Sequence, residues 1–598
     1  MTTTTRHDIK RYDIKRTVTI MARSSSKYSS TAKTRHARYV NDTFVKYARE
    51  FARETTSGGA VRVDDVIAAV ELELEDVNAV SDGTFIDARW GVENARANAR
   101  ECLCGYGRAR ARIDVMGGVA DYSGATVAQL SAANSTRVMI TVRDDRDDEQ
   151  CSRLHSSSFR VVSTSESGVD VFEGAFEKVF HVKTFEAAKT RAVFEQGASH
   201  DRWAAYVAGT ISELFCAIVS DDDAAMVALG RWIRELGARG RALDVFVSSD
   251  VPRGKGVASS AALEVATARA MVDLMLRNSI VARNNARFIA HCAMLPLYCH
   301  SAENDVVGAP CGFMDQYACF WGQPGRFLAL NCDLAKTSAL DRAVEPFRHV
   351  TLPHGLRIYA IDSGVRHSNS GGSDYAHVRC GTFMGRKMLF NEIEARLDED
   401  LACEFSLCGT IDVDGWDNGS PGSPESWSRH VDEEMTGELF LARFIRHDDE
   451  PYTEVQRSPD VKYALRSTVH HALHENARVK AFLNIIDSWL VDENGDALHR
   501  ARALGDLMFE SHESYNSIKL GSTETDAIVA IVHDVDPQRN HLFGAKITGG
   551  GCGGAVCVLA SDTPEAQAAI ERVRELFATK TGTDKPRVLH AAKATLAR

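Results

Sequence analysis

One stretch of the chain combines glycines, hydroxyls and a lysine in the spacing of an anion-binding loop. Residues 251–265 read VPRGKGVASSAALEV, with Gly254 and Gly256 in the loop and Ser259 and Ser260 where an Ala- and Leu-rich segment begins. Such a loop exposes backbone N–H groups, and the positive end of the following helix dipole strengthens their attraction for an anion. The pattern predicts a phosphate site, with an ordinary strand–turn–helix as the alternative. It is not a Walker A loop, because Lys255 is followed by glycine rather than by Ser or Thr.

Two further turns are rich in glycine. Residues 116–124 (MGGVADYSG) place Asp121 at the edge of a turn that allows a ligand to approach the backbone closely. Residues 549–554 (GGGCGG) hold five glycines in six positions. Because such a run costs much conformational entropy, it indicates close contact with a ligand or with another backbone.

Two carboxylates lie in the segment that follows the loop and its helix. Glu303 and Asp315 are twelve residues apart, with glycines and Pro310 between them, so the chain could bring both to one cleft. On their own, two acids among 82 are better explained as solvated surface residues.

The elements that would position these residues are strands and helices in a mixed order. Alternating or β-branched patterns predict strands over residues 105–115, 125–130, 137–143, 242–249, 327–332 and 356–361. Helical spacing predicts helices over 201–219, 261–276, 286–295 and 564–579, and a helical region over 433–514. On the first strand, Arg108, Arg110 and Arg112 are expected to share one face.

Length and composition limit the class of protein. A chain of 598 residues with 44% apolar and 25% charged residues is expected to form two or more soluble globular domains, and no apolar run is long enough to span a bilayer. The formal charge is −12, although residues 1–40 hold ten Lys and Arg against two Asp. The acidic remainder argues against nucleic acid as the main partner. The fourteen cysteines contain no zinc-type pair, which favours buried free thiols in a reducing, cytoplasmic compartment.

Three segments have no visible chemistry. Residues 1–40 are basic and rich in Thr and Ser, which predicts a disordered tail, with an organelle-targeting peptide as the alternative. Residues 41–100 read as a helical lead-in of unknown role, and residues 409–428 read as a surface loop.

The order of the motifs resembles that of the GHMP small-molecule kinases. The segments are RIDVMGGVADYSG (112–124), PRGKGVASSAALEV (252–265) and KITGGGCGG (546–554). CGFMDQ (311–316) and VRHS (365–368) narrow the resemblance to the galactokinase branch, and the details are similar to the plant-type L-arabinokinases over residues 100–595. The resemblance implies a two-domain α/β and α+β fold. A ribosomal S5-like α/β domain is expected over residues 101–345 and a ferredoxin-like α+β domain over 346–598.

The resemblance also implies roles for particular residues, with ATP and Mg²⁺ as cofactors. It assigns Asp315 as general base and Arg112 as its charge-stabilising partner. It assigns Ser260 and Glu303 as Mg²⁺ ligands. The phosphates are expected on Gly254, Lys255, Gly256, Val257, Ala258, Ser259 and Ser260. The sugar is expected at Asp121, Gly118, Gly312 and Tyr375, and the closing third motif at Gly549, Gly550, Gly551, Gly553 and Gly554.

One difference from galactokinases bears on the substrate. They have Glu-His where this chain has Gly118-Val119, and that pair holds the C6 end of the sugar. A pocket without both polar side chains would leave a 6-hydroxyl buried and unpaired, which favours a pentose. The expected reaction is therefore ATP-dependent phosphorylation of L-arabinose to β-L-arabinose 1-phosphate by a monomer or weak homo-oligomer without a membrane partner. A galactokinase, or a non-catalytic sensor of ATP and sugar, is the alternative. Arg110-Ala111 stands where the family has Pro-Gly, so the resemblance does not predict the local backbone conformation.

Overall fold

A computed structural model of the chain describes residues 103–144, 158–165, 168–237, 241–333, 347–366, 373–394, 406–410, 427–444, 451–492 and 495–592. The predictions for residues 1–100, and for most of the loop at 409–428, lie outside these ranges. All the cysteines within them are free thiols, as the sequence predicts.

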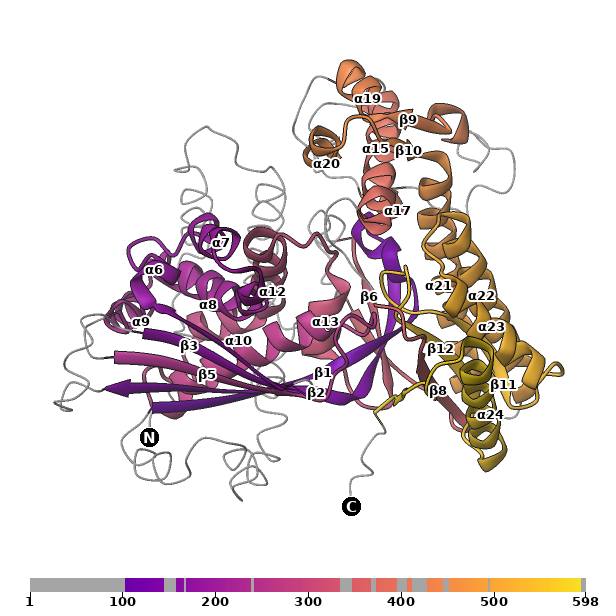
Figure 1. Cartoon of the computed structure of the whole chain (residues 1–598), viewed down its shortest axis with the longest axis horizontal. Coiled ribbons are helices and arrows are strands. Elements are labelled where there is room, and N and C mark those ends of the chain that lie inside the picture. The colour runs from indigo at the N-terminus through magenta and orange to yellow at the C-terminus, as the bar shows by residue number, and fades with distance from the viewer. Residues whose placement is uncertain are drawn as a thin grey trace, which may run out of the picture.

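The first domain is built on a seven-stranded mixed sheet with helices on one face (Figure 1). Its strands lie in the order β4 (Gly168–Ala175), β3 (Ser158–Ser165), β5 (Arg241–Ser249), β2 (Thr126–Asp144), β6 (Arg326–Asn331) and β7 (Phe347–Thr351), and β1 (Leu103–Met116) also pairs with β2. Only β3 and β5 run parallel. The covering helices include α7 (Ala187–Gln196), α8 (Ala204–Val219), α9 (Ala224–Glu235), α10 (Ser259–Arg277), α11 (Ala286–Ala293), α12 (Leu295–Ser301) and α13 (Met314–Trp321).

A β-bulge in β1 changes which face its side chains point to. The pairing with β2 shifts register between Arg110 and Arg112. Ala109 belongs to the core under α10, whereas Ala111 and Ile113 belong to a second core on the other side. Arg112 therefore points to the opposite face from Arg108 and Arg110, and the prediction that all three share a face is wrong. An extra residue in one strand re-aims the side chains that follow it.

Strand β2 is one long strand, where the sequence suggested two. Its first part, Thr126–Leu130, pairs with β6, and its last part, Thr136–Asp144, pairs with β5. The small polar residues between them resemble a turn, but pairing of Ser131 and Ser135 with β1 keeps the backbone in the ladder.

The second sheet has the strand order of a ferredoxin-like domain. Strands β11 (Leu542–Ile547), β12 (Ala555–Ser561), β8 (Leu356–Asp362) and β13 (Val588–His590) lie side by side and are all antiparallel. Helices α23 (Thr523–Val535) and α24 (Pro564–Thr581) pack on one face. The other face shares a core with β1 and β2, to which α21 (Arg466–Val491) and α22 (Ala497–Ser517) contribute. The two-domain α/β and α+β fold is confirmed.

A helical lobe is inserted between β8 and β11 (Figure 1, top). It contains α15 (Asp374–Glu394), α19 (Gly437–Arg443), α20 (Pro451–Arg457) and the small two-stranded sheet of β9 (Glu434–Thr436) and β10 (Lys462–Ala464). Both α15 and α21 contact the short 3-10 helix η1 (Gly118–Ser123). The lobe therefore covers the turn that carries Asp121.

The border between the domains at residues 345 and 346 stays a prediction, and the first sheet itself continues past it to β7. None of the helices in the described ranges is both long and apolar enough to cross a bilayer.

Candidate active site

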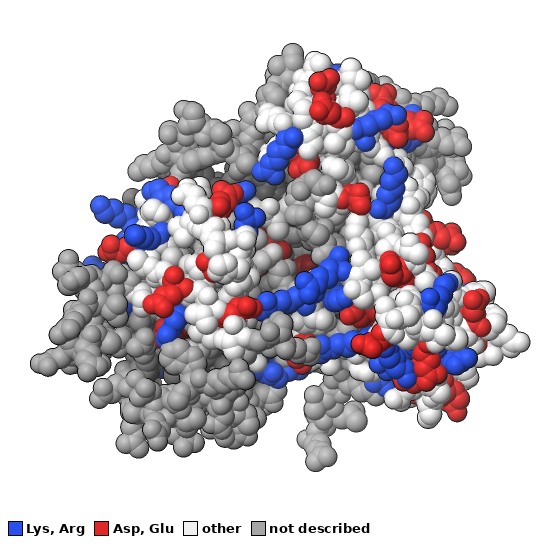
Figure 2. Space-filling view, in the orientation of Figure 1, with Lys and Arg blue, Asp and Glu red and all other residues white. Residues whose placement is uncertain are grey.

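A cavity of about 610 Å³ is lined by residues of both domains. Figure 2 shows a hollow near the middle of this face, with Lys and Arg side chains along its lower rim. The cavity wall contains most of the residues that the sequence singled out: Arg112, Asp121, Gly254, Gly256, Val257, Ala258, Ser259, Ser260, Glu303, Gly312, Asp315, Tyr375 and Gly550.

The predicted phosphate loop has the backbone of an anion site. Gly254, Gly256 and Ala258 all have positive φ (69°, 66° and 60°), so left-handed residues alternate with others along the loop. This alternation turns successive N–H groups toward one side. Ala258 is the N-cap of the 19-residue helix α10, and no side chain caps that end. The first N–H groups of α10 are thus left without a capping partner beside the cavity, where an anion can accept their hydrogen bonds.

Lys255 differs from the rest of the loop. It does not line the cavity, and its Nζ lies 2.8 Å from Oδ1 of Asp362 at the end of β8. The side chain of Lys255 therefore connects the phosphate loop to the second domain.

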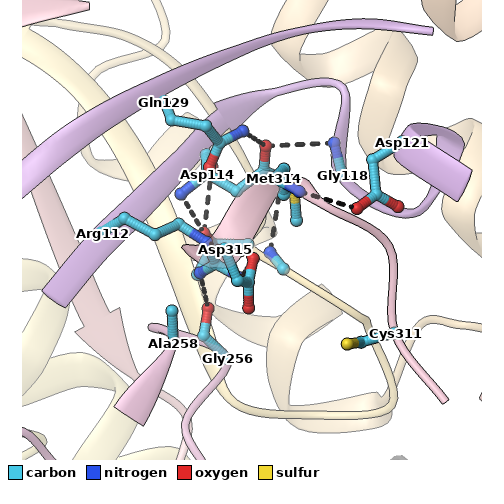
Figure 3. A network of polar contacts seen from close by, with 12 residues as sticks. Arg112, Asp114, Gly118, Asp121, Gln129, Gly256, Ala258, Cys311, Met314 and Asp315 are labelled. Atoms are coloured by element: carbon cyan, nitrogen blue, oxygen red, sulfur yellow. Dashed lines mark hydrogen bonds and ion pairs between the residues drawn. The ribbon is translucent and has the colours of Figure 1, made fainter. Parts of the chain in front are cut away.

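Arg112 holds the candidate base against the phosphate loop (Figure 3). Its Nε and Nη2 donate to Oδ1 of Asp315 at 3.0 and 2.8 Å, and its Nη1 donates to the carbonyl of Gly256 at 2.5 Å. Arg112 is 2% exposed. Burial alone would lower its pKa, but the carboxylates of Asp315 and Asp114 outweigh that effect and raise it. The guanidinium is therefore a fixed positive charge between base and loop.

Carboxylates gather on the wall next to Asp315. Glu303 lies in a π-helical turn, η4 (Ala302–Val307), and hydrogen-bonds Ser260. Gln316 donates from Nε2 to Oε2 of Glu303 at 2.7 Å and to Oε2 of Glu264 at 3.1 Å. Burial, followed by repulsion from Asp315, raises the pKa of Glu303 to about 7. Such a group of buried acids is stabilised by a cation.

Asp121 enters the same cavity from η1. Its Oδ1 accepts from the N–H of Tyr122 at 2.7 Å, and its Oδ2 accepts from the N–H of Met314 at 3.3 Å. Burial, and then repulsion from Asp315, raises the pKa of Asp121 to about 7. Gly312 makes room for this carboxylate, because a Cβ there would lie 2.0 Å from Oδ2 of Asp121. Tyr375 of α15 lines the cavity on the same side.

The glycines of the third motif touch backbone rather than open space. A Cβ on Gly549 would lie 2.6 Å from the carbonyl oxygen of Gly256, and one on Gly554 would lie 2.9 Å from the carbonyl of Lys255. Of the two explanations that the sequence left open for this run, the structure shows contact with another backbone. Gly550 alone of the five lines the cavity, whereas Gly549, Gly551, Gly553 and Gly554 lie behind it.

A buried ion pair joins the first motif to the third. Nζ of Lys546 on β11 lies 2.9 Å from Oδ2 of Asp114 on β1, and neither side chain is exposed. Asp114 also accepts from Gln129 at 2.7 Å and from the N–H of Gly118 at 3.0 Å (Figure 3). Both charged residues were quoted within motifs but received no role. The available signal was a charged residue directly between two apolar ones, Ile113 and Val115 for Asp114 and Ala545 and Ile547 for Lys546.

One wall of the cavity is made of residues that the sequence motifs did not indicate. It consists of aromatic and basic side chains from α7, from the start of α8 and from the residues between them: Arg191, Phe194, Arg202, Trp203 and Tyr206. Trp203 and Tyr206 lie within the helix predicted over residues 201–219, to which the sequence assigned no chemistry. Nothing in the sequence pattern places the two arginines in this cavity, because the tertiary packing of α7 and α8 brings them there.

Comparisons with known proteins agree with this architecture. The chain matches the GHMP kinases N-terminal domain over residues 223–323 and the GHMP kinases C-terminal domain over residues 495–579. It is 30% identical to a galactokinase of Streptomyces coelicolor over 370 residues, which cover 61% of this chain and 73% of the relative. The chain therefore belongs to the GHMP kinase family.

Two further matches refine the comparison. The chain is 31% identical to an L-arabinokinase of Arabidopsis thaliana over 515 residues, 79% of this chain. It spans only 44% of that relative's length. The crystal structure of Lactococcus lactis galactokinase with galactose superimposes with a TM-score of 0.50 at 18% identity, covering 84% of this chain and 98% of that one. This last match concerns the fold alone.

Proposed function

We propose that the protein is an ATP- and Mg²⁺-dependent sugar kinase that phosphorylates the anomeric hydroxyl of L-arabinose to β-L-arabinose 1-phosphate. The observation that carries this proposal is the position of Arg112, whose guanidinium binds Asp315 with two nitrogens and the phosphate loop with the third. A candidate base is thereby held directly beside a candidate phosphate site.

Phosphoryl transfer needs positioning and charge stabilisation more than covalent chemistry. Asp315 would accept the proton of the attacking sugar hydroxyl. Arg112 would hold the carboxylate in place and stabilise negative charge that develops on the hydroxyl oxygen and the phosphoryl oxygens. The uncapped start of α10 would bind the phosphates through backbone N–H groups.

The residues present fit Mg²⁺. Ser260 and Glu303 offer hard oxygens beside the loop. Burial and, after it, Asp315 raise the pKa of Glu303, and a bound cation would stabilise its ionised form. The described residues contain no group of three or more His, Cys, Asp or Glu side chains arranged for a metal. That is the expected pattern for Mg²⁺, which binds through one or two carboxylates plus substrate phosphates. When bound, the ion would neutralise phosphate charge.

The cavity wall formed by α7 and the start of α8 supports a proposal for how the nucleotide is oriented. Trp203, Tyr206 and Phe194 present aromatic surface to the same cavity as the phosphate loop, with Arg191 and Arg202 among them. Aromatic faces suit a purine base, and Arg202 suits the negative charges attached to it, whereas Arg191 already pairs with Glu195 at 2.6 Å. We therefore place the base at α7 and α8 and the sugar at η1 and α15.

The sugar end favours a pentose. Val119 and Tyr375 line the cavity and pack in one apolar cluster with Tyr515 and Ile547. A hydroxymethyl group placed against this cluster would lose the hydrogen bonds that it makes in water. That loss costs about 1–3 kcal/mol, or roughly tenfold or more in selectivity.

The test is ADP release by the purified chain with Mg-ATP, comparing L-arabinose, D-galactose and D-glucuronate. We expect the highest kcat/KM with L-arabinose. Activity on D-galactose alone would retain the kinase and reject the pentose. ATP binding without ADP release on any of the three would favour a sensor.

A further inference from the structure

The buried hydroxyl of Tyr515 occupies the space that a side chain on Gly118 would need. Tyr515 lies near the end of α22 and is 0% exposed. A Cβ on Gly118 would lie 1.5 Å from its hydroxyl oxygen, and Gly118 has a φ of +44°. No side chain can therefore be added at position 118 while Tyr515 keeps its place.

The same hydroxyl joins the two turns on either side of it. It accepts a hydrogen bond from the N–H of Val119 at 2.9 Å and donates one to the carbonyl of Gly549 at 2.9 Å. Val119 and Gly550, the residue after Gly549, both line the cavity. The buried phenol of Tyr515 thus fixes the turn that carries Val119 relative to the turn that carries Gly549 and Gly550.

The tyrosine is itself held firmly. Its ring meets the ring of His471 edge-on at 5.1 Å, and Nζ of Lys546 lies 5.2 Å from the ring centroid. Burial raises the pKa of Tyr515 well above its ordinary value, so the hydroxyl stays protonated and can donate to Gly549.

We infer that Tyr515 is a positioning residue that determines sugar specificity. It engages the Val119 N–H, which is then not offered to the substrate, and it leaves only the apolar Val119 side chain toward the cavity. A sugar with a hydroxymethyl group finds neither a donor nor a polar side chain at this wall. The inference rests on the proposed function, since it concerns which sugar the same site accepts.

The first test compares Tyr515→Phe with Tyr463→Phe. Tyr463 is a matched control, because it is also buried and donates its hydroxyl to a backbone carbonyl. That carbonyl belongs to Ser458, which does not line the cavity, whereas Tyr515 bonds the cavity residue Val119. Kinetic constants for L-arabinose, D-galactose and ATP would be measured for both variants and for the wild type. We expect Tyr515→Phe to raise the D-galactose to L-arabinose ratio of kcat/KM by about threefold or more through the sugar KM, with the ATP KM unchanged.

An equal ratio in the wild type and in both variants would overturn the inference. So would a change in the ATP KM that matches the change in the sugar KM, because that would indicate general loosening. Failure of the proposed function looks different, because the wild type itself would then phosphorylate neither sugar, or D-galactose alone.

A second test needs no activity. The melting temperature would be measured for Gly118→Ala in the wild type and in a Tyr515→Val background. Because valine leaves the shared volume empty, Gly118→Ala should lower the melting temperature less in that background, whereas the strain from positive φ is common to both. Equal losses would show that the hydroxyl and position 118 do not compete for space.

Discussion

Asp315 and Arg112 concentrate the proposed chemistry in a single ion pair beside the phosphate loop. Asp315→Asn keeps the shape of the side chain but cannot take up a proton. We expect kcat to fall by about 100-fold or more, while the dissociation constant of ATP, measured by calorimetry, changes by less than about threefold. Asp487→Asn is the control, because Asp487 also pairs with an arginine, Arg348, but is exposed and lies outside the cavity wall. Turnover near the wild-type value in Asp315→Asn would remove this residue from its role.

Asp121, a residue proposed to bind the sugar, imposes a cost on the stability of the fold. Its pKa is about 7 in the folded protein against an ordinary value of 3.8, so folding favours the protonated form. Stability must then fall as the pH rises from about 4 to 7, and stay at the lower level above 7. Asp121→Asn removes this titration.

We therefore expect Asp121→Asn to stabilise the protein more at pH 8 than at pH 5, by about 2–3 kcal/mol in the free energy of unfolding. Denaturant unfolding at the two pH values measures the difference. An equal effect at both would mean that Asp121 is ionised throughout.

At the scale of elements, β1 has two functions that depend on its bulge and its buried aspartate. The bulge aims Arg112 into the cavity. Asp114, two residues later, pairs with Lys546 of β11 and so attaches the first motif to the third. Arg110 and Ala111, which depart from the family's Pro-Gly, lie at the bulge itself, and Arg112 still reaches Asp315.

Removing one partner of the Asp114–Lys546 pair should be costly. Lys546→Met leaves a buried carboxylate without its cation, and we expect a loss of about 3–5 kcal/mol in the free energy of unfolding. Lys585→Met is the control, because its partners are exposed glutamates on α24. Equal small losses in both variants would contradict a fully buried pair.

Much of the element pattern could be predicted from the sequence, since helical and alternating periodicity reports burial directly. Helix α10 and strands β5 and β8 are examples, because each is a largely apolar run framed by turn residues. The bulge in β1 and the continuity of β2 could not be predicted, because both depend on pairing between strands. The contact of Tyr515 with Gly118 joins residues almost 400 positions apart, and no local pattern reports it.

At the scale of the molecule, the two domains share a core. Ile113 of β1, Ile358 of β8 and Phe482 of α21 belong to one buried cluster, so the cavity is lined by elements that pack as one body. This arrangement keeps the phosphate loop and the third motif in contact.

Because the two domains share a core, a substitution in that core should destabilise both of them. Phe482→Ala should cost about 3–5 kcal/mol and reduce hydrogen-exchange protection in β1 and in β8 together. Phe577→Ala, in the core under α23 and α24, should reduce protection mainly in the second sheet. Loss confined to one domain in Phe482→Ala would contradict a shared core.

The central claim is phosphoryl transfer from ATP to the anomeric oxygen of L-arabinose. Phosphorus NMR of the reaction mixture with Mg-ATP and L-arabinose tests it most directly. The account predicts ADP and a new phosphomonoester signal split by the anomeric proton, absent with Asp315→Asn. Inorganic phosphate as the only product, or a phosphate ester coupled to another proton of the sugar, would contradict it.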